Sequence, residues 1–406
     1  MRIIYITSSL PYGPGEAFII PEIEELKRQG HDVLLVPMYP RGKVFHDKAE
    51  ALLGLARSQP LLSWEILKRA LSTAVKTPVK AFSALALLVG HSRSVRIIAK
   101  NLAVYPKGLW LAYVAKEWRA EHVHAHWAAT TATMALVAGE LADVPWSFTA
   151  HRWDIAENNL IALKARKAAF ARAIDRRGAQ ELAAFANWGN WLPHVIHMGV
   201  ALPLGTEHGR APIESDVFRA VMAANFVKIK GHAYLVEAVQ LLRGRGVRIR
   251  VDLLGDGPLR SAIERKVRDY GLDEELKFLG SVPHGRLMAQ LQAGAWDLMV
   301  LPSIEDQAGE REGIPVSLME AMSCGVPVIS ASTGGIPELL DGDAGILVPP
   351  KNPIALAEAI ERLARDQALR RQLAEAGRRR VQEQFKLETV VAELALRFAG
   401  CRRTEG

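Results

Sequence analysis

The sequence predicts an α/β protein built from two doubly wound parallel-sheet domains. Strand-like and helix-like segments alternate from one end to the other, which is the pattern of parallel sheets covered by helices on both faces. At 406 residues the chain is also too long for a single core, and it fits two domains of about 200 residues each. A stretch rich in glycine and proline, residues 199–209, separates the two alternating series.

The first series occupies the N-terminal half. Its predicted strands are short apolar segments with helical patterns between them, at residues 2–7, 32–37, 122–125, 146–149 and 194–197. The glycine- and proline-rich stretch follows the last of these strands. We therefore predict a first domain at residues 1–199 and a linker at residues 200–211.

The second series has the same alternation. Its predicted strands are at residues 218–224, 248–254, 276–279, 296–303 and 326–330. From Ile354 onward the pattern is mostly helical, with a predicted break near Gly377. We place the second domain at residues 212–378 and expect a C-terminal helical segment, residues 379–406, that packs back on the first domain.

The most informative motif lies between the last two predicted strands. Pro315 suits the first position of a helix, which would run over residues 316–324 and close at Gly325. Glu312 would then lie just outside the helix and Glu320 about two turns inside it. Free N–H groups from Gly313 to Val316 would face a bound anion. Because open α/β sheets bind ligands at the carboxyl edge, this position suits a diphosphate.

Composition narrows the setting in which the protein works. The only cysteines are Cys324 and Cys401, which makes a disulfide framework or a thiolate metal site untenable and fits a reducing cytoplasm. The start, residues 1–9, is predicted as a strand and not as a signal peptide. The longest apolar run, residues 81–90, is far shorter than the roughly 20 residues of a membrane-spanning helix.

The net charge of +7 is concentrated in one region. Residues 41–120 contain 14 Lys or Arg residues and four acidic residues. Two helical segments there, residues 61–70 and 109–118, mix Trp, Leu and Lys, which suits peripheral contact with an anionic membrane surface. Ordinary helices with a solvated basic side explain the pattern equally well. Nucleic acid is a weaker interpretation, because no nucleic-acid-binding signature accompanies the charge.

Three motifs resemble other sites, and for each we favour a structural role. His122, His124 and His126 alternate on a predicted strand, but no nearby carboxylate or cysteine completes a zinc site. The segment 341–343, Asp-Gly-Asp, is typical of a turn. The segment 255–257, Gly-Asp-Gly, lacks the third glycine of a dinucleotide-binding fingerprint.

Several segments together resemble the family 4, or group 1, glycosyltransferases of the GT-B fold, in which two Rossmann-like domains face a cleft. In the second half these segments are Lys228 to His232, Gly255 to Arg260, Phe278 to Val282, Glu312 to Glu320, Thr333 to Glu338 and Gly345 to Pro350. In the first half they are Pro11 to Ile19, His124 to Ala128 and Pro145 to Ile155. The Pro11 to Ile19 loop is similar to that of members that build exopolysaccharides or lipid-linked glycans.

The resemblance implies a retaining glycosyltransferase that uses a nucleoside diphosphate sugar. Glu312 and His151 would contact the donor sugar as catalytic residues, and Glu320 would bind the ribose. Lys230 and the dipole of the helix after Pro315 would stabilise the diphosphate, so neither a metal nor another cofactor is expected. The residues implied in donor binding are Gly13, Gly15, Asn225, Lys230, Val282, Gly313, Ile314, Pro315, Val316 and Glu320. Gly13 and Gly15 would let the first loop approach the phosphates.

One departure from the family pattern keeps alternatives open. Many members carry an Arg five positions before the Lys of the Lys-Gly turn, where this chain has Asn225, which brings no charge. The expected acceptor is a glycan or a lipid-linked glycan at the cytoplasmic membrane face. The alternatives are a GT-B sugar-nucleotide epimerase or phosphorylase, and a sugar-nucleotide-binding protein without turnover.

Overall fold

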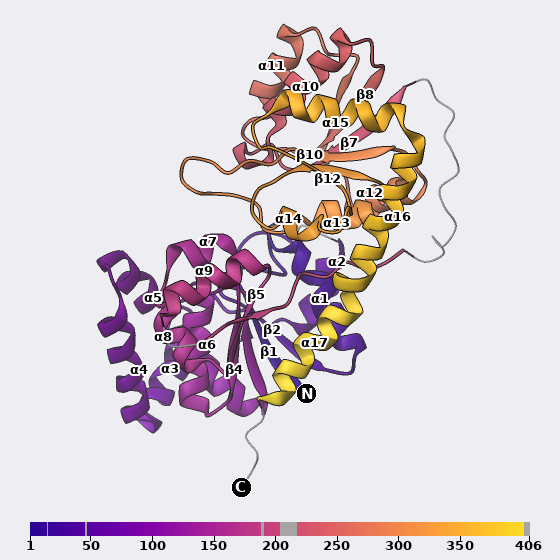
Figure 1. Cartoon of the computed structure of the whole chain (residues 1–406). Coiled ribbons are helices and arrows are strands. Elements are labelled where there is room, and N and C mark those ends of the chain that lie inside the picture. Colours follow the sequence, from indigo (N-terminus) through magenta and orange to yellow (C-terminus); the bar gives the residue numbers. More distant parts are fainter. Residues whose placement is uncertain (14, 45–46, 188–190, 204–216, 402–406) are drawn as a thin grey trace. The chain divides into compact units, whose positions relative to one another are not determined.

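The computed structural model describes residues 1–13, 15–44, 47–187, 191–203 and 217–401, and it divides into two compact units (Figure 1). Unit 1 comprises Met1–His197 and Leu387–Gly406, and unit 2 comprises Met198–Lys386. Most of the predicted linker, from residue 204 to residue 211, lies outside the described residues. The predicted boundary at residue 379 falls inside a helix of unit 2, and the chain returns to unit 1 only at Leu387.

Unit 1 contains a six-stranded parallel sheet in the order β2-β1-β3-β4-β5-β6. Its strands are β1 (Arg2–Thr7), β2 (Asp32–Pro37), β3 (His122–Ala125), β4 (Trp146–Ala150), β5 (Phe170–Ala173) and β6 (His194–Val195). Five of them confirm predicted strands. Strand β5 was not predicted, because an arginine in a four-residue strand, here Arg172, does not indicate burial. In the structure Arg172 is fully buried, and its guanidinium pairs with Glu22.

The alternation of side chains along β1 divides the core of unit 1 into two layers. Ile3 and Tyr5 point to the face covered by α1 (Ile20–Arg28) and α17 (Leu387–Gly400). Ile4 and Ile6 point to the opposite face, covered by α5 (Val95–Glu117) and α6 (Thr130–Ala142). The C-terminal helix α17 is therefore part of the core of unit 1, where Phe398 is fully buried.

The remaining helices of unit 1 surround these layers. They are η1 (Ala17–Ile19), α2 (Asp47–Glu50), η2 (Leu53–Leu55), α3 (Trp64–Lys76), α4 (Pro78–His91), α7 (Arg152–Glu157), α8 (Ile161–Lys167) and α9 (Arg176–Ala186). Residues 109–118, predicted as a second segment suited to a membrane surface, belong to α5. Trp110, Leu111 and Val114 in this segment are fully buried, so they do not contact a membrane. Among the described residues no single helix meets the length and hydropathy of a membrane span; α3 and α4 do so only jointly, across a 111° bend.

Unit 2 contains a second six-stranded parallel sheet, in the order β12-β11-β10-β7-β8-β9. Its strands are β7 (Phe218–Ala223), β8 (Ile249–Leu254), β9 (Leu276–Gly280), β10 (Leu298–Leu301), β11 (Val328–Ala331) and β12 (Ile346–Val348). The first five confirm predicted strands, and β12 was not predicted. This strand order is that of a doubly wound, Rossmann-type sheet.

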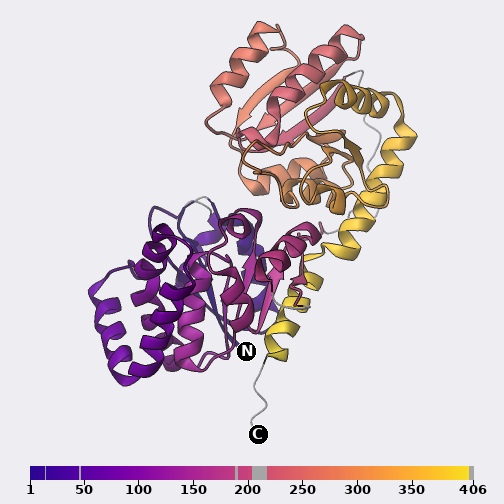
Figure 2. The same ribbon diagram turned by 60° about the vertical axis from the view of Figure 1, so that its left-hand side comes forward.

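Helices cover both faces of this second sheet (Figure 2). They are η3 (Lys228–Lys230), α10 (His232–Gly244), α11 (Arg260–Asp269), α12 (His284–Gln292), α13 (Val316–Ser323), α14 (Ile336–Leu339), α15 (Pro353–Arg365) and α16 (Gln367–Gln384). The predicted break near Gly377 is wrong, because α16 continues through it. A Cβ atom at Gly377 would lie 3.0 Å from the Ala344 carbonyl oxygen, so this glycine permits close packing of α16 and does not interrupt it.

Candidate functional site

The loops after β7 and β10 bring together two of the predicted site residues in unit 2. These two strands are neighbours in the sheet but are the first and fourth in the sequence, so the winding of the chain reverses between them. Ligands of open α/β sheets bind at the carboxyl edge beside such a reversal. Lys230 follows β7 and Glu312 follows β10, and Lys230 Nζ forms an ion pair with Glu312 Oε1. The side chain of Lys230 is 20% exposed and that of Glu312 is 9% exposed, so the pair is largely buried.

Glycines let the backbones of these loops approach each other closely. Gly231 ends the Lys-Gly turn with φ +76°, and a Cβ atom there would lie 1.9 Å from the Pro302 carbonyl oxygen. Gly334 follows β11 with φ +59°, and a Cβ atom there would lie 1.9 Å from the Glu312 carbonyl oxygen. Any side chain at either position would therefore displace the loop that carries Lys230 or Glu312.

Helix α13 begins at Val316, four positions after Glu312, with one difference from the prediction. Pro315 has φ −68° and ψ 122° and is the N-cap, so the first helical residue is Val316. The helix ends at Ser323, and Gly325 adopts φ +68° just beyond it, as expected for a glycine that terminates a helix. Gly313 accepts a hydrogen bond from Gly335 N–H at 3.2 Å through its carbonyl oxygen. The positive end of the α13 dipole thus lies next to the Lys230–Glu312 pair.

Glu320, the second glutamate of the motif, lies inside α13 and is 9% exposed. Its Oε1 lies 2.6 Å from His284 Nε2 at the start of α12. The sequence analysis did not single out His284, although it stands two positions after Val282, one of the predicted donor-binding residues. The structure therefore brings the Val282 segment to Glu320 through His284.

Asn225, the departure from the family pattern, is exposed at the end of β7. Next to it, a Cβ atom at Gly255 would lie 2.2 Å from the Ala224 carbonyl oxygen, and one at Gly257 would lie 2.8 Å from that of Phe226. The Gly-Asp-Gly segment thus has a packing role, because it allows the loop after β8 to lie against the loop after β7.

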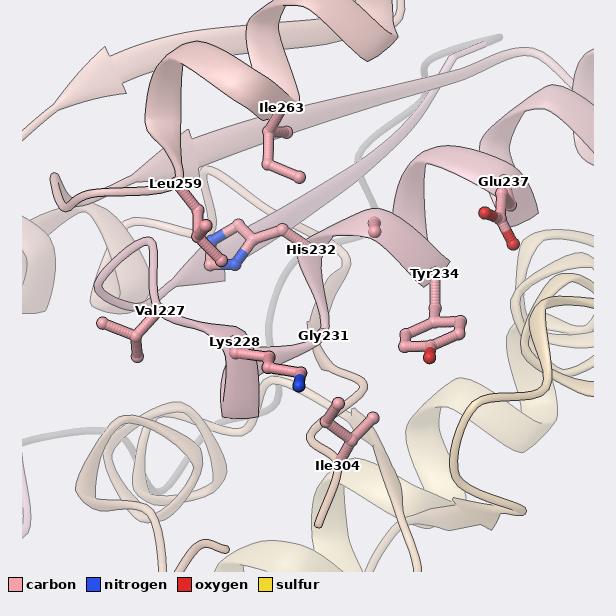
Figure 3. Close-up of a pocket in the computed structure, with 10 residues that line it drawn as sticks. Val227, Lys228, Gly231, His232, Tyr234, Glu237, Leu259, Ile263 and Ile304 are labelled. Atoms are coloured by element: carbon pink, nitrogen blue, oxygen red, sulfur yellow. The ribbon is translucent and has the colours of Figure 1, made fainter. Parts of the chain in front are cut away.

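A pocket of about 270 Å³ opens beside the Lys-Gly turn, between the starts of α10 and α11 (Figure 3). Lys228, Gly231 and His232 are among its lining residues, whereas Lys230, Glu312 and Glu320 are not. His232 is 4% exposed and stacks on Phe226 with ring centroids 4.2 Å apart. Burial lowers the pKa of His232 to about 4, so the ring is neutral at pH 7. The pocket is therefore separate from the two glutamates.

In unit 1, Glu16 holds the first loop in place. Its buried carboxylate accepts hydrogen bonds from the backbone N–H groups of Ser8, Ser9 and Leu10, at 2.8, 2.6 and 2.8 Å. Gly13 has φ +73°, which favours glycine, whereas a Cβ atom at Gly15 would meet no protein atom within 4 Å. That a side chain at Gly15 would clash with a phosphate remains a prediction.

His151 directly follows β4 and is the N-cap of α7, with 8% exposure. Asp154 fixes this corner, because Oδ1 accepts from His151 N–H and Oδ2 from Ala128 N–H, both at 2.7 Å. Burial raises the pKa of Asp154 to about 7, although these amides act in the opposite direction. Lys164 Nζ donates to the carbonyl oxygens of Ala128, Ala129 and Asn159. The loops after β3 and β4 are thus tied together at His151.

A chain of buried hydrogen bonds leads from Arg172 to His151. Arg172 Nη1 donates to Glu22 Oε2 at 2.7 Å, and the Tyr5 hydroxyl donates to Glu22 Oε1 at 2.6 Å. Tyr5 OH also lies 2.6 Å from His126 Nδ1, and His126 Nε2 lies 3.1 Å from His151 Nε2. Of these five residues only His151 was predicted to be functional. The sequence does not indicate that the other four lie next to it, because they come from separate parts of the chain.

The direction of these hydrogen bonds determines which nitrogen carries the proton in the His126 ring and in the His151 ring. Because the Tyr5 hydroxyl donates to Glu22, its oxygen accepts from His126 Nδ1–H. His126 Nε2 then carries a lone pair and accepts from His151 Nε2–H. Burial lowers the pKa of His151 to about 3, so the ring is neutral and serves as a hydrogen-bond donor toward His126.

From this hydrogen-bond chain we predict that Tyr5→Phe lowers the stability of the protein. The substitution leaves a buried carboxylate oxygen of Glu22 and His126 Nδ1–H without their partner, so the urea-unfolding free energy should fall by about 1–3 kcal/mol. The matched control is Tyr12→Phe, which removes a hydroxyl bonded to Ser58 at 3.2 Å in a partly exposed position. A loss for Tyr5→Phe no larger than for Tyr12→Phe would contradict the assignment.

The motifs given a structural role have one in the structure. His122 Nε2 and His124 Nδ1 lie 2.7 and 2.8 Å from the Ser147 hydroxyl, and His124 Nε2 lies 2.9 Å from that of Thr149. The Asp-Gly-Asp segment forms a turn in which Asp343 has φ +58°. Within the described part of the chain, no three His, Cys, Asp or Glu side chains are grouped so that they could hold a metal ion.

The fold and site define a class of protein. A solved structure of HepE from Anabaena in complex with UDP superposes with a TM-score of 0.71 and 18% identity, over 98% of this chain and 100% of that chain. A glycosyltransferase from Rickettsia africae gives a TM-score of 0.70 and 17% identity, over 100% and 99%. These neighbours confirm the predicted GT-B fold. Residues 206–380 match the family described as glycosyl transferases group 1, and this match lies in unit 2.

Named relatives come from polysaccharide biosynthesis. The putative colanic acid biosynthesis glycosyltransferase WcaL of Salmonella typhimurium is 32% identical over 203 residues, which are 50% of this chain and 49% of the relative. The putative teichuronic acid biosynthesis glycosyltransferase TuaC of Bacillus subtilis is 27% identical over 95% of each chain. In the alignments with WcaL and with AmsK of Erwinia amylovora, the chain spans about half the length of the relative or less.

Proposed function

We propose that this protein transfers a sugar from a nucleoside diphosphate sugar to a glycan or lipid-linked acceptor, with retention of the anomeric configuration. The observation that carries the proposal is the Lys230–Glu312 ion pair at the reversal between β7 and β10, with the start of α13 four positions after Glu312. This arrangement supports the proposal because it combines an ammonium group and a helix N-terminus, which suit a diphosphate, with buried carboxylates, which suit sugar hydroxyls.

The chemistry of sugar transfer suits these groups. When the bond between the anomeric carbon and the diphosphate breaks, negative charge builds up on the leaving phosphate and positive charge on the sugar. Lys230 and the backbone amides at the start of α13 would stabilise the leaving diphosphate. Glu312 would accept hydrogen bonds from the donor sugar and interact favourably with positive charge at its anomeric carbon. No metal is assigned a role, and His151 as a donor-sugar contact stays a prediction.

The relatives support the choice of donor and acceptor. HepE has been solved with UDP and with UDP-glucose, so a uridine diphosphate sugar is the first donor to test. Three relatives are named as glycosyltransferases of colanic acid, amylovoran and teichuronic acid biosynthesis. A growing glycan at the cytoplasmic membrane face is therefore the proposed acceptor.

Nucleotide binding tests the proposal before any acceptor is known. A ligand that binds only the folded protein raises the Tm, by about 2.7 kcal/mol of stabilisation at 100 times the Kd. We expect such a shift with UDP, GDP or ADP, and we expect Glu320→Ala to remove most of it because the ribose loses its hydrogen-bond acceptor. Glu310→Ala, at an exposed position outside α13, is the matched control. No shift with any nucleotide, or an equal shift in Glu320→Ala, would contradict the proposal.

A further inference from the structure

The helical hairpin α3–α4 leaves an apolar stripe in contact with solvent. On α3, Trp64, Leu67, Leu71 and Val75 follow one another at spacings of three and four, which places them along one side of the helix. Their exposed fractions are 79%, 41%, 68% and 71%. The side that packs on the core is a different one, formed by Ile66 and Ala70.

The second helix of the hairpin repeats this arrangement. On α4, Val79 and Phe82 are 80% and 74% exposed, whereas Ala81, Ala84 and Leu88 are buried in the core of unit 1. Each helix therefore has two apolar sides, of which only one contributes to folding. We call the exposed set the hairpin face, defined as Trp64, Leu67, Leu71, Val75, Val79 and Phe82. Figures 1 and 2 both show α3 and α4 at the outer edge of unit 1.

Exposure of this kind is not explained by folding. Soluble proteins rarely leave large contiguous apolar patches in water unless the patch binds something. Burying a side chain as large as Trp or Phe is worth about 1.5–3 kcal/mol, which the free protein forgoes at each of these positions. The hairpin face therefore indicates a partner with an apolar component.

The charge around the hairpin face identifies the chemistry of that partner. Residues 62–102 contain seven Lys or Arg residues and a single acid, Glu65. Three of these basic residues already have carboxylate partners: Arg69 with Glu65, Lys80 with Asp143 and Lys100 with Glu157. The other four are exposed and form no ion pair with any described residue; they are Lys68, Lys76, Arg93 and Arg96. The partner must therefore combine apolar and anionic groups.

We propose that the hairpin face docks on an anionic lipid surface, with Trp64 and Phe82 inserted at the headgroup level and Lys68 and Lys76 on the lipid phosphates. Aromatic and aliphatic side chains flanked by lysines are the composition of interfacial helices. Each lysine near an anionic leaflet adds about 1 kcal/mol of attraction. A second copy of this chain would present the same positive charges in a symmetric contact, so charge complementarity favours lipid over self-association.

Vesicle flotation of the full chain tests the proposal without donor or acceptor. We expect the protein to float with vesicles of phosphatidylcholine and phosphatidylglycerol in equal parts, and not with phosphatidylcholine alone, and binding should weaken as salt rises. Trp64→Ser with Phe82→Ser should lower the vesicle affinity by about tenfold or more. Lys68→Gln with Lys76→Gln should lower it by roughly tenfold or more.

Matched controls separate the hairpin face from general surface effects. Ile354→Ser with Leu396→Ser removes apolar side chains that are 55% and 72% exposed elsewhere, and Arg265→Gln with Arg371→Gln removes exposed charges elsewhere. Both controls should float like the unchanged protein. Circular dichroism should give all four variants the unchanged fold, since every substituted side chain is exposed.

Three outcomes would overturn the proposal. They are equal flotation with both kinds of vesicle, flotation that the hairpin-face variants do not weaken, and a dimer in sedimentation velocity that Trp64→Ser with Phe82→Ser abolishes. The last would mean that a second copy covers the face. Because flotation needs no nucleotide, its failure would leave the proposed sugar transfer untouched, and the reverse also holds.

Discussion

Lys230→Ala is expected to lower kcat/KM for sugar transfer, or for slow hydrolysis of the donor, by about 10²–10³. The substitution removes the cation that lies at the reversal between β7 and β10. Asn225 brings no charge to replace it, so only the helix dipole of α13 would remain to stabilise the departing diphosphate. Donor turnover measured over a range of donor concentrations gives the effect.

The same substitution should also destabilise unit 2, and a double variant separates the two effects. Glu312 is a buried residue, 7% exposed, and without Lys230 its carboxylate loses its ion-pair partner, at a cost of about 1–3 kcal/mol in unfolding free energy. Lys230→Ala combined with Glu312→Gln should recover most of the stability and none of the activity. Lys228→Ala, an exposed lysine two positions earlier, is the matched control. Full activity in Lys230→Ala would place the diphosphate elsewhere.

Unit 1 is expected to lose several kcal/mol of stability between pH 7 and pH 5.5. Burial lowers the pKa of His122 and of His151 to about 3, and it holds the pKa of His124 and of His126 well below the usual value. In the unfolded chain these rings titrate near pH 6.5. The unfolded state therefore binds more protons below pH 6.5, and stability that is fully present above pH 6.5 is lost as the pH falls toward 3.

Between pH 7 and pH 5.5 the unfolding free energy should fall by about 1 kcal/mol for each histidine, or by about 4 kcal/mol if all four rings stay neutral in the folded protein. Asp154 acts in the opposite sense, because its raised pKa means that the folded state binds the proton more tightly between pH 4 and 7. Urea unfolding at several pH values measures the slope, and His124→Gln should reduce it by one proton. A slope that His124→Gln leaves intact would mean that His124 is charged in the folded protein.

The candidate site was predictable where neighbours in the sequence remain neighbours in space. Glu312, the start of α13 and Glu320 lie within nine residues, so helix geometry alone placed them correctly to within one residue at Pro315. The partners of these glutamates come from other loops. Lys230 was predicted at the diphosphate but not as the ion-pair partner of Glu312, and His284 was not predicted at all, because both contacts depend on which strands are adjacent in the sheet.

The fold was predictable where periodicity is strong. Ten of the strands in the described residues were predicted from their apolar segments, and β5 and β12 were not. Arg172 in β5 is buried only because Glu22 and two backbone carbonyl groups from distant parts of the chain receive its guanidinium. The break predicted near Gly377 is wrong for the converse reason. A glycine within a helix indicates a break unless a neighbouring segment leaves no room for a side chain, and here that neighbour is Ala344.

The sequence by itself determined two parallel-sheet domains, the helix after Glu312 and the basic character of residues 41–120, because hydrophobic periodicity, capping residues and charge are local properties of a chain. Only the tertiary structure decided that Lys230 meets Glu312, that Tyr5 and His126 lead to His151, and that α3 and α4 expose an apolar face while α5 is buried. The two residues of each of these side-chain contacts are 25 to 121 positions apart in the sequence, and such contacts follow from strand order and packing, which local patterns do not encode.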